Sequence, residues 1–278
     1  MLQFRELFSA NKRGSDRLVR AVTPVRDRRL EAAIAADEID IQFQPQIDPV
    51  DNRVIGVEAL ARWADVPNPE ALFARALNAG LAERLSRTIQ RKALRTVGQW
   101  RGALRGLHLS LNVLPQDLDR FGYDSWLLSE IALAGLSPRR VTVEIIESAL
   151  LLDRPAVAAR LASLREQGIE IAVDDFGTGY ANLLYLTSLP LDAIKIDRAM
   201  VADLVGHERD RIVVKAMISM ARELGLKVIV EGVENVAQLE LIAGWGVDLY
   251  QGFLGAGALD PAELARFVAI SNALADAA

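Results

Sequence analysis

Residues 169–180 read IEIAVDDFGTGY, and this stretch decides the fold that we expect for the whole chain. Its first part, residues 169–173, has the apolar and β-branched content of a buried strand. Two neighbouring carboxylates, Asp174 and Asp175, follow where that strand is expected to end, and a glycine-punctuated loop comes after them. Adjacent carboxylates repel each other, so the mouth of the strand requires a positive partner. A pair of divalent metal ions is the partner that we expect.

Helical and strand patterns alternate on both sides of this stretch. The polar turn at residues 48–53 is too short to contain a crossover helix, so the strands that flank it should pair antiparallel. We expect helices at residues 26–37, 69–78, 81–100, 125–134, 154–167, 208–224 and 235–243, with a closing helix from Pro261. We expect strands at residues 39–45, 54–61, 107–112, 140–146, 169–173, 191–197, 226–231 and 247–251.

This order of elements predicts an α/β fold in which the last six strands, separated by helices, form a parallel sheet. Eight strands close such a sheet into a TIM-like (β/α)8 barrel, with one strand near the N-terminus antiparallel to the others. An open doubly wound sheet is the alternative. It requires a phosphate-binding glycine fingerprint near its first strand, and the sequence has none there. The length of 278 residues suits a single barrel.

The composition is that of an ordinary globular protein, with 51% hydrophobic and 25% charged residues. The chain contains no cysteine, which excludes disulfides and thiolate metal sites and fits a cytoplasmic location. The longest stretch without Asp, Glu, Lys or Arg is residues 176–191, which is too short to span a bilayer. We therefore expect no transmembrane segment.

Charge divides the chain into two parts, although the net charge is only −5. Residues 1–30 carry eight Arg or Lys against three acids, Glu6, Asp16 and Asp27. We therefore expect a basic N-terminal arm or linker at residues 1–27, followed by one domain at residues 28–278. Such an arm is a candidate contact for a membrane surface or a regulatory partner, and a solvated linker is the simpler interpretation. Because the remainder is acidic, no nucleic-acid polymer is expected as the main ligand.

Polar side chains recur at the ends of the predicted strands, where a buried barrel strand should be apolar. One acid at a strand end is typically a cap or a surface ion pair, but a series of successive strands with polar residues at their ends indicates a shared site. In a barrel these ends face one rim, where enzymes with this fold carry their chemistry. The residues are Glu58, Asn112, Glu144, Glu147, Asp174, Asp175, Lys195, Asp197, Glu231, Glu234 and Gln251.

The residue types at this rim indicate hard cations rather than zinc. The two histidines, His108 inside a strand and His207 before a helix, do not lie among the acids. Carboxylates with one amide oxygen suit Mg²⁺ or Mn²⁺. Two such ions suit phosphodiester hydrolysis, because together they activate a water and neutralise the leaving oxygen. Lys195 would accept a proton from that water, orient it, or only form a salt bridge with Asp197.

The same residues occur in the order of a known family. Glu58-Ala59-Leu60 resembles the signature tripeptide of the EAL domain family, whose members are cyclic di-GMP phosphodiesterases. The tripeptide alone would mean nothing, but further family motifs follow in order, and the resemblance covers residues 28–268. They are Phe43-Gln44-Pro45, Arg62-Trp63, Asn112, residues 144–147, residues 174–180, Lys195-Ile196-Asp197, residues 231–234 and Gln251-Gly252-Phe253.

The resemblance implies a homodimeric barrel that holds two Mg²⁺ or Mn²⁺ ions and opens one phosphodiester of cyclic di-GMP to give linear pGpG. It implies that Lys195, Glu58 and Glu231 are catalytic, with Lys195 as a base or a water-orienting group. Glu147 resembles a residue that stabilises the loop after Asp175. The implied metal ligands are Glu58, Asn112, Glu144, Asp174, Asp175 and Glu231, and the implied substrate-binding residues are Gln44, Arg62, Asp197, Glu234 and Gln251.

Departures from the family pattern leave every implied ligand in place. The segment at residues 64–80 is shorter than usual, Ile146 replaces a hydroxyl residue, and Leu114 stands where a small polar residue often follows Asn112. A catalytically weak receptor that binds cyclic di-GMP and signals to a partner protein is the alternative function. Degenerate members of such families typically lose metal ligands or the lysine, so the sequence favours the enzyme.

Overall fold

The computed structural model describes residues 25–146, 154–177 and 184–277, so nearly all of the predicted arm at residues 1–27 lies outside the described residues. Within these ranges, eight strands close into one barrel in chain order. The strands are β1 (Asp40–Ile47), β2 (Val54–Arg62), β3 (His108–Val113), β4 (Val141–Ile146), β5 (Glu170–Phe176), β6 (Ala193–Ile196), β7 (Lys227–Glu231) and β8 (Leu249–Gln251).

The direction of the strands confirms the predicted TIM-like barrel. β1 runs antiparallel to both of its neighbours, β2 and β8. The pairs from β2–β3 through β7–β8 are all parallel. The carboxyl ends of β2 to β8 therefore meet at one rim of the barrel, as the strand-end acids require, and the open doubly wound sheet is excluded.

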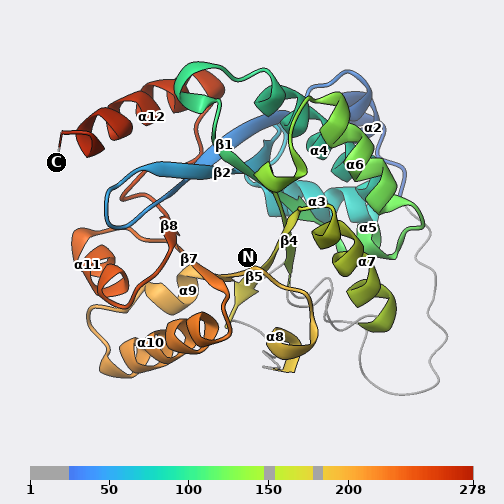
Figure 1. The fold of residues 1–278 in the computed structure, drawn as a ribbon. Coiled ribbons are helices and arrows are strands. Elements are labelled where there is room, and N and C mark those ends of the chain that lie inside the picture. The colour runs from blue at the N-terminus through green and yellow to red at the C-terminus, as the bar shows by residue number, and fades with distance from the viewer. Residues whose placement is uncertain (1–24, 147–153, 178–183, 278) are drawn as a thin grey trace.

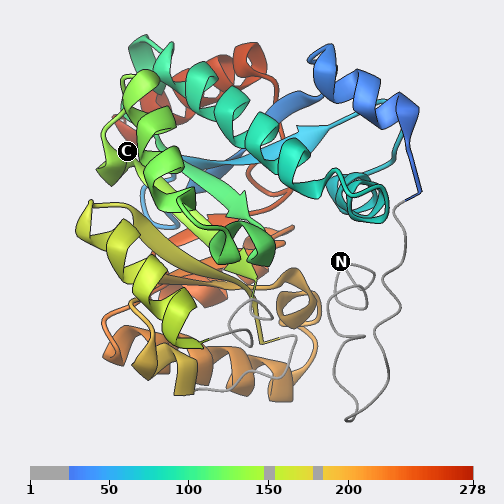
Figure 2. The same ribbon diagram turned by 90° about the vertical axis from the view of Figure 1, so that its right-hand side faces the viewer.

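Helices surround the barrel on its outside (Figures 1 and 2). Short helices α5, α8 and α9 were not predicted, because four or five residues are too few to show a helical period. None of the described helices is long and apolar enough to cross a membrane. The helices are α2 (Arg28–Ala35), α3 (Pro69–Asn78), α4 (Ala82–Gly98), α5 (Pro115–Asp119), α6 (Tyr123–Leu133), α7 (Arg154–Glu166), α8 (Leu184–Ser188), α9 (Arg198–Val201), α10 (Glu208–Glu223), α11 (Val236–Gly244) and α12 (Pro261–Ala275).

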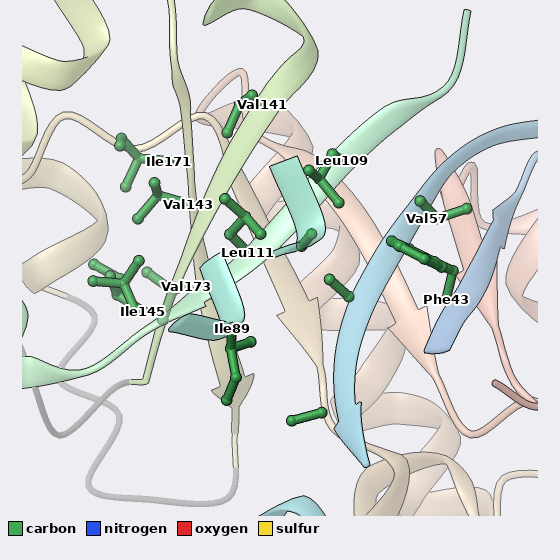
Figure 3. Close-up of a cluster of buried hydrophobic side chains, with 14 of the residues drawn as sticks. Phe43, Val57, Ile89, Leu109, Leu111, Val141, Val143, Ile145, Ile171 and Val173 are labelled. Carbon is green, nitrogen blue, oxygen red and sulfur yellow. The ribbon is translucent and has the colours of Figure 1, made fainter. Parts of the chain in front are cut away.

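Alternation along the strands separates an apolar outer face from a polar inner one. On β4, the fully buried Val143 and Ile145 belong to the hydrophobic core between strands and helices (Figure 3). Because successive side chains of a strand point to opposite faces, Glu144 between them points into the barrel. On β6, Ile194 and Ile196 flank Lys195 in the same way. The core packing therefore fixes which polar groups face the barrel axis.

Gly252 explains one of the sequence motifs by a close approach of two chain segments. A Cβ atom at this position would lie 2.2 Å from the carbonyl oxygen of Val233, which follows β7. The Val233 N–H in turn donates to the Gln251 carbonyl at the end of β8, at 3.2 Å. Only glycine leaves room for this contact, which joins the rim ends of β7 and β8 and holds Gln251 in place.

Asp27 joins the first described helix to the outer layer of the barrel. Its carboxylate caps α2 by accepting a hydrogen bond from the Leu30 N–H at 3.0 Å, and it accepts a second one from Arg75 of α3 at 3.1 Å. The Arg75 guanidinium also lies over the Trp63 ring, 4.7 Å from its centroid. The bond from Arg75 is the main reason why the pKa of Asp27 is lowered to about 2.

We expect Asp27→Ala to lower the free energy of unfolding by about 1 kcal/mol at pH 7, the typical effect of losing a helix cap. Because the pKa of Asp27 in the folded protein lies below its ordinary value of 3.8, this stabilisation is present above about pH 5 and is lost as the pH falls towards 2. Urea unfolding of the wild type and the variant at pH 7, 4 and 3 measures the difference, with the exposed Asp203→Ala as control. A difference that stays constant down to pH 3 would contradict this role.

Candidate active site

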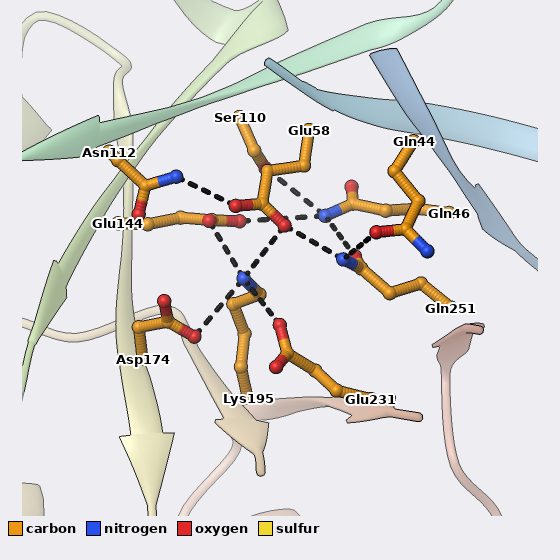
Figure 4. A network of polar contacts seen from close by, with 10 residues as sticks. All are labelled: Gln44, Gln46, Glu58, Ser110, Asn112, Glu144, Asp174, Lys195, Glu231 and Gln251. Atoms are coloured by element: carbon orange, nitrogen blue, oxygen red, sulfur yellow. Dashed lines mark hydrogen bonds and ion pairs between the residues drawn. The ribbon is translucent and has the colours of Figure 1, made fainter. Parts of the chain in front are cut away.

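Lys195 of β6 lies at the centre of a buried polar cluster inside the barrel, with its ammonium group among four carboxylates (Figure 4). The Lys195 side chain is completely buried, and the four acidic side chains are at most 12% exposed. The acids come from four different strands, so the barrel itself assembles them. Lys195 Nζ lies 3.3 Å from Glu58 Oε2, 2.8 Å from Glu144 Oε2, 3.1 Å from Asp174 Oδ1 and 2.7 Å from Glu231 Oε1.

Two amide side chains orient the Glu58 carboxylate. Asn112 of β3 donates from Nδ2 to Glu58 Oε1 at 2.7 Å, and Gln251 of β8 donates from Nε2 to Glu58 Oε2, also at 2.7 Å. Gln251 Nε2 lies 3.4 Å from Gln44 Oε1 on β1. Burial raises the pKa of Glu58, but Lys195 and the two amides outweigh burial and hold it below its usual value. Glu58 is therefore kept as a carboxylate.

The two adjacent acids Asp174 and Asp175 lie within β5 and not after it, which corrects the predicted end of this strand. β5 continues to Phe176, and its pairing with β6 shifts by one residue between Val173 and Phe176. Asp175 has a left-handed backbone with φ 57°, a conformation that aspartate adopts more readily than most residues. In a regular strand neighbouring side chains would point to opposite faces. The bulge instead brings both carboxylates towards one site.

The cluster contains more carboxyl groups than one lysine can keep ionised. Burial raises the pKa of Glu144 to about 8 and that of Asp175 to about 7. Burial also raises the pKa of Asp174 and of Glu231. For Lys195, burial lowers the pKa, but the surrounding carboxylates outweigh it and raise the pKa well above its ordinary value. The ammonium form of Lys195 is therefore favoured in this arrangement, and four carboxylates share it.

Three of these acids are placed to hold a metal ion together. One carboxylate oxygen each from Asp174, Asp175 and Glu231 lie within 4.8 Å of one another. All of the donors are carboxylate oxygens, which suit hard cations such as Mg²⁺ and Mn²⁺. The buried acids outnumber Lys195, so a divalent cation that binds here would take the place of protons on these carboxyl groups. The residues therefore fit the metal site that the sequence predicts.

The structure brings together most of the predicted site residues, but not all. Among the described residues, Arg62 and Glu234 make no hydrogen bond or ion pair with the carboxylates of the cluster. Arg62 donates to Gln42 Oε1 at 2.8 Å, and Glu234 donates from its backbone N–H to Gln238. Glu147, the predicted loop-stabilising residue, lies outside the described residues.

Asp197 does not pair with Lys195, which was one of the alternatives for that lysine. It follows β6, and its Oδ1 caps α9 by accepting from the Ala199 N–H at 2.9 Å. Its carboxyl group also contacts Asp175 and contributes to the raised pKa of that residue. Asp197 therefore lies at the edge of the cluster beside Asp175.

Sequence reasoning missed Gln46 and Ser110, which are buried beside the acids. Gln46 Nε2 lies 3.3 Å from Ser110 Oγ, 3.5 Å from Glu144 Oε1 and 3.4 Å from Gln251 Oε1 (Figure 4). A signal was present, because Gln46 is two residues from Gln44 and Ser110 is two residues from Asn112, so each shares the inner face of its strand.

Comparisons with known proteins agree with this geometry. The model of the EAL domain family matches residues 27–258. Cyclic di-GMP phosphodiesterase NbdA of Pseudomonas aeruginosa is 33% identical over 264 residues, which cover 90% of this chain and 33% of NbdA. This chain thus spans about a third of the length of that relative.

Solved structures show the same fold. The PaMucR phosphodiesterase in complex with c-di-GMP is 30% identical, with a TM-score of 0.79 over 84% of this chain and 97% of that one. BlrP1 of Klebsiella pneumoniae, in a complex with manganese and cyclic di-GMP, is 28% identical, with a TM-score of 0.73 over 85% of this chain and 58% of BlrP1.

Proposed function

This chain belongs to the EAL domain family, and on that premise we propose that it hydrolyses cyclic di-GMP to linear pGpG. The observation that supports this most is the buried cluster, in which acids from four strands surround Lys195. In the proposed reaction, water attacks one phosphorus atom and the bond from that phosphorus to a ribose 3′ oxygen breaks. The ring opens to a product with one 5′ phosphate and one free 3′ hydroxyl.

We propose that the acids of the cluster hold two Mg²⁺ or Mn²⁺ ions. When bound, such ions polarise the phosphodiester and lower the pKa of water. The oxygen donors support this assignment, as does the number of buried carboxyl groups, which exceeds the single ammonium group of Lys195. The proposed ligands are Glu58, Asn112, Glu144, Asp174, Asp175 and Glu231.

Lys195 is assigned the orientation of the attacking water and the stabilisation of negative charge on the phosphate. Its ammonium group lies among four carboxylates, which raise the pKa of Lys195 well above its ordinary value while they hold no metal ion. The role of a base, which the resemblance also implies, stays a prediction. A fixed positive charge in a buried site interacts strongly with a phosphate that gains charge during the reaction.

The residues that flank the cluster are proposed to bind the nucleotide. Gln251 donates both to Gln44 and to Glu58, so it connects Gln44 to the acids. Arg62 is half-buried at the end of β2, where Gln42 holds its guanidinium, and a planar cation suits a phosphate or a guanine edge. Asp197 and Glu234 follow β6 and β7 on the same rim and complete the proposed substrate set.

Incubation of the purified protein with cyclic di-GMP and Mg²⁺ or Mn²⁺, followed by separation of the nucleotides, tests the proposed function. We expect linear pGpG to form and EDTA to abolish its formation. Tight binding of cyclic di-GMP without any pGpG over many hours would overturn the enzyme in favour of the receptor. The homodimer, the regulatory partner of the basic arm and the cytoplasmic location stay predictions.

Ca²⁺ is expected to inhibit the reaction. It is larger than Mg²⁺ and accepts looser coordination, whereas the acids of this cluster lie close together around one ammonium group. Replacing Mg²⁺ by an equal concentration of Ca²⁺ should lower the rate of pGpG formation by about tenfold or more. Rates with each ion alone and with both together measure the effect. A full rate with Ca²⁺ alone would show that the site does not require a small cation.

A further inference from the structure

Gln90, on helix α4 outside the barrel, donates a hydrogen bond to the backbone of Asn112. β2 pairs with β3 only as far as the pair of Glu58 and Ser110, so Asn112 lies two residues beyond the last pair with β2. The Asn112 carbonyl oxygen instead accepts a hydrogen bond from Gln90 Nε2 on α4 at 3.2 Å. The side chain of Asn112 donates to Glu58 at 2.7 Å. The backbone of Asn112 is therefore held by its pairing with Glu144 of β4 and by the hydrogen bond from Gln90, while its side-chain amide reaches Glu58.

Gln90 itself is held in one orientation by buried neighbours. The side chain is 1% exposed, and its Oε1 accepts from the hydroxyl of Tyr123 on α6 at 3.0 Å. Its Nε2 also lies 3.0 Å from Ser86 Oγ, one turn earlier on α4. A buried glutamine amide costs stability unless its donors and acceptor are bonded. Here both ends of the amide are bonded, so the group that contacts the Asn112 carbonyl is rigid.

The contacts of Gln90 extend to the helix that follows β3. Ser86 Oγ donates to Asp117 Oδ2 at 2.6 Å, and Asp117 is completely buried on α5. Asp117 also accepts from the Leu114 N–H at 3.3 Å and from Arg120 at 3.1 Å. The network thus fixes the chain on both sides of the end of β3. A buried polar network whose members are bonded in this way makes the surrounding structure rigid.

We propose that Gln90 is a positioning residue that sets the location of Asn112, and through it the affinity of the cluster for divalent cations. The inference rests on the proposed function, because it takes Asn112 as one of the metal ligands. Gln90 touches neither the ions nor the substrate. It acts through one hydrogen bond to the Asn112 carbonyl, and loss of that bond leaves the backbone that carries the ligand held by its pairing with β4 alone.

Direct binding of Mn²⁺, followed by electron paramagnetic resonance in the absence of nucleotide, tests this inference. Gln90→Met removes the amide but keeps the length of the side chain, and we expect it to weaken Mn²⁺ binding by about tenfold or more, as loss of an outer hydrogen-bond partner typically does. Gln90→Glu keeps an oxygen that accepts from the Tyr123 hydroxyl but lacks the N–H group that donates to the Asn112 carbonyl. It replaces Gln90→Met in this experiment if Gln90→Met fails to fold. An affinity within about twofold of the wild type would overturn the proposal.

A double-mutant cycle with Asn112→Ala separates positioning from a merely structural role. If Gln90 acts through Asn112, Gln90→Met should have no further effect on Mn²⁺ affinity once the Asn112 side chain is absent. Losses that multiply in the double variant would overturn the proposal, because they would show that Gln90 acts independently of Asn112.

The opposite end of the same strand offers a matched control. Arg140 donates to the Leu107 carbonyl just before β3 at 2.7 Å, so it also supports the strand backbone from a side chain. We expect Arg140→Leu to lower the melting temperature without changing Mn²⁺ affinity. An equal loss of affinity in this variant would overturn the specific role of Gln90. If the wild-type protein binds no Mn²⁺, the proposed metal site is wrong. If the wild type and the Gln90 variants bind Mn²⁺ with the same affinity, only the positioning role of Gln90 is wrong.

Discussion

Glu58→Ala is expected to reduce the turnover of cyclic di-GMP by about a thousandfold or more. In the proposed site Glu58 is a metal ligand, and the charge stabilisation supplied by a catalytic metal is worth several kcal/mol. A loss of about 4 kcal/mol corresponds to a factor of about a thousand in rate. Glu58 also connects the amides of Asn112 and Gln251 to the ammonium group of Lys195, so no neighbouring carboxylate takes its place. Initial rates of pGpG formation at saturating Mn²⁺ measure the effect.

Two further variants show whether the loss of turnover comes from removal of the negative charge of Glu58 or from destabilisation of the fold. Glu58→Gln keeps the size of the side chain but removes its negative charge, and it should be nearly as inactive. Glu130→Ala also removes a nearly buried carboxylate with an arginine partner, Arg91, but on the outer helix α6. It should lower stability and leave the rate close to that of the wild type. Wild-type turnover in Glu58→Ala would contradict the proposed ligand set.

Lys195→Met is the second variant with a large expected effect, and it acts on both stability and turnover. Removing one partner of a buried ion pair typically costs about 3–5 kcal/mol, because the remaining charges stay buried and unpaired. Here one ammonium group contacts four carboxylates, so its loss leaves them to repel one another. We expect the metal-free variant to unfold at lower urea concentration than the wild type and to recover part of that loss in Mn²⁺, because the ions neutralise the same acids.

Turnover of Lys195→Met should fall by about a thousandfold even where Mn²⁺ restores the fold, because the cation that orients water and phosphate is absent. Lys195→Arg keeps the charge and separates the electrostatic effect on stability from the placement of the cation. Urea unfolding with EDTA and with Mn²⁺, together with rates under the second condition, gives both quantities. A variant as stable and as active as the wild type would contradict the central place of Lys195.

Much of the fold follows from local sequence pattern. The short turn at residues 48–53 predicts the antiparallel start of the barrel, and alternating helices and strands predict its parallel remainder. The convergence of Glu58, Glu144 and Glu231 follows from the same pattern, because parallel strand ends meet at one rim.

Other parts of the site depend on contacts between distant residues and leave little local signal. The bulge at Asp174 and Asp175 depends on how β5 pairs with β6, and the sequence alone gives no register for that pair. In the sequence alone, Gln90 cannot be distinguished from the other polar residues of an amphipathic helix. Its role emerges only when α4 is packed against β3 and its amide reaches the carbonyl of Asn112.

The central claim is that acids from separate strands hold divalent cations where the phosphodiester is cleaved. An anomalous-difference map from a crystal of the protein grown with Mn²⁺ and cyclic di-GMP tests it most directly. The account predicts two peaks among the carboxylates of Glu58, Glu144, Asp174, Asp175 and Glu231, with a phosphate of the nucleotide next to them. A map with bound nucleotide but no peak among these carboxylates would contradict it.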